Sequence, residues 1–175
     1  MLAVKTNKPI TLSDETLNRI QSVMEQYPEG KSKSALLPVL HIVQDENAGW
    51  LSVEAMDKVA ELMKLRPIEV YEVATFYSMY NLKPVGKFLL EVCHTGPCAI
   101  RKGEWLVDYL KKKLRINVGE TTADGMFTLK TVECLGACGY APMMQVGEFY
   151  YEFLETPEKV DKLLEDFRMK VISKN

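Results

Sequence analysis

Residues 87–106, KFLLEVCHTGPCAIRKGEWL, join an apolar run to a cysteine-containing loop and then to an amphipathic segment. The run KFLLEV, residues 87–92, is short and almost wholly apolar, which is typical of a β-strand buried on both faces. Residues 99–116 then place apolar side chains on one helical face and lysines on the other. The apolar residues are Leu106, Val107, Leu110 and Leu114. The stretch therefore predicts a buried strand followed by a helix, with Cys93 at the end of the strand and Cys98 at the start of the helix.

The residues that follow predict one more strand, a two-stranded hairpin and a final helix. MFTLKTVEC, residues 126–134, alternates like a strand that ends at Cys134. PMMQV and EFYYEF are separated by Gly147 and predict a hairpin, with Pro142 at the start or edge of its first strand. Thr156 and Pro157 can open a helix. The order β-α-β-β-α predicts an α/β sandwich.

The residues that precede the quoted stretch read as four short helices. Residues 11–27 and 33–49 show helical periodicity, and Pro38 either delays the start of the second helix or kinks it. Ser52 is placed to cap a third helix, and Pro67 to be the first residue of a fourth. These helices predict a small bundle in residues 1–82 and a separate domain in residues 83–175.

Composition and charge exclude several classes of protein. Hydrophobic residues make up 47% of the 175 and charged residues 26%, which is ordinary for a soluble globular chain. The net charge of −2 provides no basic surface for nucleic acid or a membrane. The N-terminal residues lack the apolar core of a secretory signal, and no apolar run approaches the ~20 residues that span a bilayer. We expect a cytoplasmic protein with no nucleic-acid partner and no direct membrane contact.

The four cysteines form two close pairs, Cys93 with Cys98 and Cys134 with Cys138. A reducing cytoplasm disfavours disulfides, so paired cysteines there more often bind a metal or carry redox chemistry. Because loops at strand ends can converge on one edge of a sheet, the four thiolates could all bind one metal ion or one metal cluster. The dipole at a helix N-terminus is expected to lower the pKa of Cys98. The small residues Gly96, Gly136 and Gly139 would let backbone N–H groups approach the sulfur atoms.

The spacing of the cysteines leaves two kinds of metal site open. C-x₄-C and C-x₃-C are possible for a zinc site, although zinc pairs usually have two intervening residues. The spacing also differs from that of plant-type ferredoxins, and a thioredoxin-type C-x-x-C is absent. No nucleophile–base pair and no glycine-rich phosphate loop is evident, so we predict no catalytic residues and no bound NAD or flavin in this chain.

Three stretches resemble the family of small iron–sulfur subunits of respiratory NADH:quinone oxidoreductase (complex I). They are VCHTGPCAIRKGEWL (92–106), VECLGACGYAPMMQV (132–146) and LHIVQDENAGWLS…VYEVATFYSMY (40–80). The resemblance implies an α+β chain, in which an N-terminal helical bundle precedes a thioredoxin-like ferredoxin domain. It also implies one 2Fe–2S cluster, with Cys93 and Cys98 on one iron and Cys134 and Cys138 on the other. By analogy with thioredoxin-like folds, the Ala141–Pro142 peptide bond is expected to be cis.

The resemblance further implies an electron-transfer subunit on the peripheral arm of a membrane-associated complex. FMN and NADH would be bound by the partner subunit, and other peripheral-arm subunits would also be partners. The equivalent subunit of an NAD-linked hydrogenase or formate dehydrogenase is an alternative, as is a zinc-stabilised interaction module. We expect residues 1–82 to act as a docking domain, with Tyr77 and Tyr80 as exposed aromatic contacts.

Overall fold

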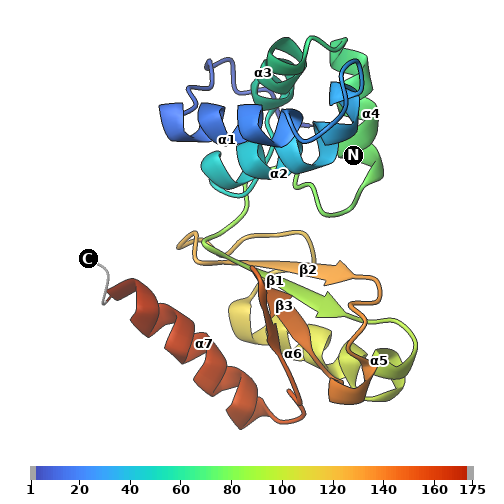
Figure 1. The fold of residues 1–175 in the computed structure, drawn as a ribbon. Helices are drawn as coiled ribbons and strands as arrows, with labels where there is room; N and C mark the ends of the chain where they lie inside the picture. The colour runs from blue at the N-terminus through green and yellow to red at the C-terminus, as the bar shows by residue number, and fades with distance from the viewer. Residues whose placement is uncertain (1–2, 173–175) are drawn as a thin grey trace. The chain divides into compact units, whose positions relative to one another are not determined.

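The structure is a computed structural model that describes residues 3–172. The chain divides into two compact units, and the division falls between Pro84 and Val85. Figure 1 shows the first unit built of helices alone and the second built around a sheet. The α+β fold that the resemblance implied is therefore confirmed. Among the described residues, none of the helices combines the length and the apolar character that a membrane crossing requires.

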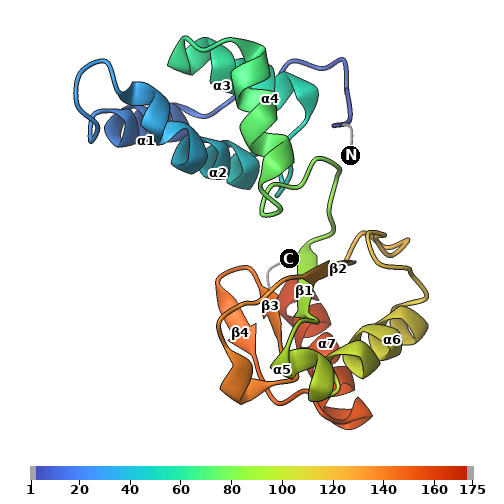
Figure 2. The same ribbon diagram turned by 90° about the vertical axis from the view of Figure 1, so that its right-hand side faces the viewer.

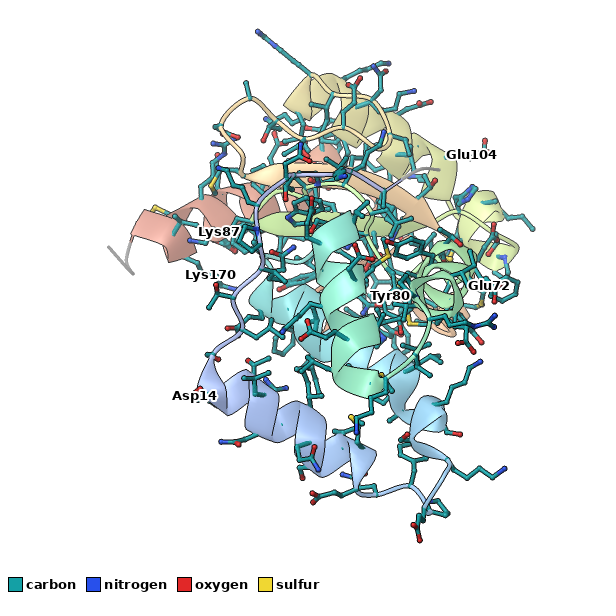
Figure 3. The ribbon with its side chains drawn as sticks, turned by 90° about the horizontal axis from the view of Figure 1, so that it is seen from above. Asp14, Glu72, Tyr80, Lys87, Glu104 and Lys170 are labelled. Atoms are coloured by element: carbon teal, nitrogen blue, oxygen red, sulfur yellow. The ribbon has the colours of Figure 1, made fainter. Side chains whose placement is uncertain are left out.

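The first unit contains four α-helices and one turn of 3₁₀-helix. They are α1 (Asp14–Met24), η1 (Ser32–Ala35), α2 (Leu36–Glu46), α3 (Val53–Met63) and α4 (Pro67–Phe76). Asp14 opens α1, where its charge is favourable to the helix dipole (Figure 3). Ser52 caps α3 and Pro67 is the first residue of α4, as predicted. Pro38 lies in the first turn of α2, where helical N–H groups need no intrahelical acceptor, so it delays the helix and does not kink it.

The helices of the first unit share one hydrophobic core. Most of its fully buried residues come from α2, α3 and α4, and these include Val39, Leu40, Val43, Ala55, Val59 and Val70. Tyr80 also belongs to this core, because only 5% of it is exposed and its hydroxyl donates to the carbonyl of Leu37 at 2.9 Å. The prediction that Tyr80 is an exposed contact is therefore wrong. The segment after α4 folds back onto α2, and this places the Tyr80 side chain against Leu37.

The second unit contains a four-stranded mixed sheet in the order β2-β1-β3-β4 (Figure 2). The strands are β1 (Phe88–Cys93), β2 (Phe127–Val132), β3 (Met144–Val146) and β4 (Phe149–Tyr151). β1 and β2 are parallel, whereas β3 pairs antiparallel to both β1 and β4. Val146 pairs with Phe149, so the predicted hairpin turns at Gly147 and Glu148.

Two helices of the second unit lie side by side and share its core with the sheet. They are α6 (Gly103–Leu114) and α7 (Pro157–Ile172). Asp161 of α7 accepts a hydrogen bond from the Tyr109 hydroxyl of α6 at 2.7 Å and pairs with Lys113 of the same helix at 2.7 Å. The core includes Leu90 and Val92 of β1, Leu106 and Leu110 of α6, and Leu164 and Phe167 of α7.

Two sequence predictions about this unit are wrong. β1 is not buried on both faces, because Leu89 and Glu91 are only partly buried and Glu91 pairs with Lys130 at 3.2 Å. The helix predicted over residues 99–116 is two helices, α5 (Pro97–Ile100) and α6, since Lys102 takes a left-handed conformation with φ +68° between them. The break lets the chain turn at the cysteine loop before α6 begins.

Candidate functional site

Parallel pairing of β1 and β2 brings the two cysteine loops together. Cys93 is the last residue of β1 and lies opposite Val132, the last residue of β2. Because the strands run in the same direction, both loops leave from the same edge of the sheet. The first loop leads to Cys98, the second residue of α5. The second carries Cys134, two residues beyond the end of β2, and Cys138 at the start of the 3₁₀-helix η2 (Cys138–Tyr140).

The four thiols are free and lie near one another in two pairs. Cys93 lies close enough to Cys98 to shift its pKa, Cys134 does the same to Cys138, and both outer thiols act electrostatically on Cys98. The first pair is buried, with 2% of Cys93 and 1% of Cys98 exposed, whereas the second pair is exposed. The structure thus brings all four predicted residues into one site with an inner and an outer pair.

Backbone groups of both loops act on the sulfur atoms. The N–H of Gly136 donates to Cys134 Sγ at 3.3 Å. The backbone of Thr95 and that of Leu135 both act to lower the pKa of Cys93, and the Thr95 hydroxyl lies 3.9 Å from Cys93 Sγ. Leu135 belongs to the second loop, so both loops influence the thiol of Cys93. Sequence analysis missed Thr95 and Leu135, because a backbone donor has no side-chain signal.

The inner pair lies in a small apolar cluster of its own. This cluster contains Cys93, Cys98, Ala137, Ala141 and Met143, with Leu135 packed against it. Met143 follows the Ala141–Pro142 bond, which is cis as the thioredoxin analogy predicted. The Met143 carbonyl accepts the N–H of Cys93 at 3.4 Å. The end of β1 is therefore held from the β3 side as well as from the β2 side.

Burial and mutual contact move the pKa values of the inner pair apart. Burial and the hydrogen bond with Cys93 raise the pKa of Cys98 to about 12. Burial also opposes ionisation of Cys93, but the N–H groups of Thr95 and Leu135 outweigh it and lower the pKa of that thiol. The expectation that a helix dipole lowers the pKa of Cys98 is wrong, because α5 has only four residues and the thiol is buried.

The four donors of the site are all sulfur atoms, which both zinc and iron–sulfur clusters accept as ligands. Two neighbouring pairs of thiols are what a 2Fe–2S cluster requires, since its four cysteine ligands are divided between two irons. The residues present therefore fit this cluster.

Comparison with known proteins also points to a 2Fe–2S protein, and the matches extend over most of the chain. Residues 20–168 match the family model of the thioredoxin-like [2Fe-2S] ferredoxins. A subunit of the NADH-quinone oxidoreductase of Rickettsia typhi is 42% identical over 162 residues, which cover 93% of this chain and 95% of the relative. Mitochondrial NADH dehydrogenase [ubiquinone] flavoprotein 2 of Dictyostelium discoideum is 41% identical over 89% of this chain and 63% of the relative.

Solved structures show the same fold in a larger protein. A crystal structure of an NAD⁺-reducing [NiFe]-hydrogenase in the air-oxidised state superposes with a TM-score of 0.66 at 20% identity. The match covers 78% of this chain but only 23% of that chain, so this protein spans about a quarter of its structural neighbour. The resemblance drawn from the motifs is thus confirmed by relatives over most of the length. The chain belongs to the family of thioredoxin-like [2Fe-2S] ferredoxins, together with proteins that are named as subunits of NADH-quinone oxidoreductase.

Proposed function

We propose that this chain is the electron-transfer subunit of an NADH:quinone oxidoreductase and holds one 2Fe–2S cluster. Cys93 and Cys98 would bind one iron, and Cys134 and Cys138 the other. The observation that carries the proposal is the convergence of two cysteine pairs, one from each loop, at the same edge of the sheet. The relatives' names supply the parent complex.

The residues around the site are suited to a centre that gains and loses negative charge. When bound, such a cluster accepts and releases one electron. The backbone of Thr95, Leu135 and Gly136 acts on the sulfur atoms, where it stabilises added negative charge. The apolar cluster around the inner pair keeps water from one side. Neither feature requires an acid, a base or a nucleophile in this chain.

The two cysteine pairs differ in exposure, so one side of the site is open to a partner and the other is not. Cys134 and Cys138 are exposed, whereas Cys93 and Cys98 are buried. Tyr140, two residues after Cys138, is also exposed and packs edge-on against Phe153 with ring centroids 5.8 Å apart. We infer that electrons enter and leave on the side of Cys134 and Cys138, which would have to come near the FMN of the partner once the chain has docked.

The helical unit supports the proposal through its exposed apolar residues. Phe76, at the end of α4, is 80% exposed, and Ile68, Tyr77 and Met79 are exposed as well. Exposed aromatic side chains are frequent anchors of protein interfaces. We propose that this unit docks the chain onto the flavin-bearing subunit. The assembled complex would then lie at the cytoplasmic face of a membrane.

A hydrogenase subunit is the second candidate, because the structural neighbour is part of an NAD⁺-reducing hydrogenase. That likeness is at 20% identity and supports the fold alone, whereas the NADH-quinone oxidoreductase relative is 42% identical. Isolation of the tagged chain with its native partners distinguishes the two. Co-purification of a nickel-containing subunit would favour the hydrogenase.

The test of the site itself uses the full chain, reconstituted anaerobically with iron and sulfide. We expect about two irons and two sulfides per chain, a red-brown colour and an electron paramagnetic resonance signal on reduction. Replacement of any one of the four cysteines by Ala should abolish or badly destabilise that signal. The matched control is His94→Ala, which alters the residue next to Cys93 and should keep the cluster. A cysteine variant with full iron content and an unchanged spectrum would show that its ligand assignment is wrong.

A further inference from the structure

Gly103, the first residue of α6, has no room for a side chain. A Cβ atom built on it would lie 2.6 Å from the carbonyl oxygen of Cys98, 2.9 Å from the carbonyl carbon of Cys98 and 3.0 Å from the carbonyl oxygen of Cys93. All three are backbone atoms, so no flexible side chain can move aside. The residues touched are the two cysteines of the inner pair.

Space is the only reason that the structure shows for glycine at this position. Gly103 is helical, and its φ lies outside the left-handed region that favours glycine. Glycine also supplies no side chain that could complement the dipole of α6. The residue before it, Lys102, is left-handed and provides no side-chain cap for α6. Glycine therefore stands where α6 meets the backbone of both inner cysteines.

We propose that Gly103 is a positioning residue for the inner iron. By letting α6 approach the carbonyl groups of Cys93 and Cys98, it determines how close the end of β1 and the start of α5 lie, and hence the separation of the two thiolates. This inference rests on the proposed function, because it assumes that the pair holds one iron. Iron–thiolate bonds have short, defined lengths, so displacement of either backbone segment distorts the coordination.

The expected effect of Gly103→Ala follows from the contact distances. The Cβ of alanine must push the Cys98 carbonyl away, and Cys98 Sγ moves with its backbone. The electron paramagnetic resonance g values of the reduced cluster should shift, the reduction potential should change, and the half-life of the cluster in air should shorten severalfold. The melting temperature of the metal-free chain should also fall, because the clash is present without iron.

A second tightly packed glycine of the same chain provides the matched control. Gly86 is also tightly packed, with backbone atoms of Gly125, Met126 and Phe127 at 3.0 Å, yet it precedes the opposite end of β1. Gly86→Ala should lower the melting temperature without altering the spectrum or the potential.

The outcomes separate the positioning role from the proposed function. A wild-type chain that takes up no iron and sulfide would overturn the proposed function itself. A normal wild-type cluster with wild-type spectrum, potential and half-life in Gly103→Ala would overturn only the role of Gly103, even if the variant melts earlier. If Gly103→Ala does not fold, the same measurements are made in a Lys102→Gly background, where glycine at φ +68° should recover stability. An unchanged spectrum in that double variant, compared with Lys102→Gly alone, would equally refute the proposal.

Discussion

Gly136 acts in the site through its conformation and through its N–H group. Its φ of +74° lies in the left-handed region, which glycine adopts without strain. In this conformation its N–H donates to Cys134 Sγ at 3.3 Å. Gly96 is also left-handed, with φ +48°, whereas Gly139 has an ordinary φ. The three glycines of the cysteine loops therefore differ in backbone conformation.

Replacement of Gly136 by Val is predicted to lower the reduction potential or shorten the lifetime of the cluster. A β-branched residue is strained at this φ, so the loop should shift and the N–H···S bond should lengthen. The added electron would then be less well stabilised. Potentiometric titration followed by electron paramagnetic resonance measures the effect. The control is Gly119→Val, which alters a left-handed glycine (φ +87°) outside the cysteine loops and should leave the potential unchanged. Equal potentials and half-lives in the Gly136 variant and the wild type would contradict the prediction.

At the scale of single elements, α3 depends on its N-cap. Ser52 is buried, and its hydroxyl accepts the N–H of Ala55 at 3.1 Å. We predict that Ser52→Ala lowers the free energy of unfolding by about 1 kcal/mol, because a helix N–H loses its acceptor away from water. Urea denaturation of the full chain measures this loss. Ser34→Ala, which alters an exposed residue of η1, should change stability by less than about 0.5 kcal/mol. Equal losses in the two variants would show that the cap contributes nothing.

Glu69 links η1 to the first turn of α4 and should make their packing pH-dependent. Its hydrogen bond with Lys33 and those with the backbone and side chain of Arg66 lower its pKa to about 2 from an ordinary value of 4.5. A depressed carboxyl pKa contributes stability that is complete above the unfolded-state pKa and is lost as pH falls through the folded-state pKa.

The predicted stability of the metal-free chain therefore decreases between about pH 4.5 and pH 2, in part through this residue. In Glu69→Gln, which has no ionisable group at this position, the decrease should be shallower. Melting temperatures of both proteins across this pH range measure the difference. Parallel curves for the two proteins would mean that Glu69 titrates alike in the folded and unfolded chains.

At the scale of the whole molecule, chemistry and packing surface are divided between the two units. All four cysteines lie in the second unit, which has a core of its own and a further small core beneath the site. The first unit has a separate hydrophobic core and exposes Phe76 at the end of α4. Because each unit has a hydrophobic core of its own, we predict that the second unit folds without the first.

A chain truncated to begin at Lys83 is predicted to keep the reduced-cluster spectrum but to lose co-purification with the flavin-bearing partner. The ligands remain, whereas the proposed docking surface is removed. In the full chain, Phe76→Ser should weaken the same interaction, with the cluster unchanged, because it removes an exposed aromatic contact. Pull-down with the co-expressed partner measures both. Should the truncated chain bind the partner as tightly as the full chain, docking belongs to the second unit.

Local sequence patterns correctly predicted the features that depend only on residues close together in the chain. The caps at Ser52 and Pro67, the turn at Gly147 and the start of α7 at Pro157 were predictable, because capping and turn formation act over a few residues. The four cysteines were also evident as one candidate site, since parallel strands bring their loops to one edge. The motifs around them identified the family, which the relatives confirm.

What each of these residues touches depends on how the whole unit packs. Periodicity continued through Lys102, but the contact of Gly103 with the backbone of Cys93 and Cys98 requires the helix to break there. Tyr80 looked like an interface residue until the fold placed it against Leu37 of α2. The pKa of Cys98 is raised by burial and by Cys93, which outweigh the dipole of a four-residue helix. In each case the deciding contact joins segments that local sequence patterns treat separately, so its energy enters only when the chain is packed.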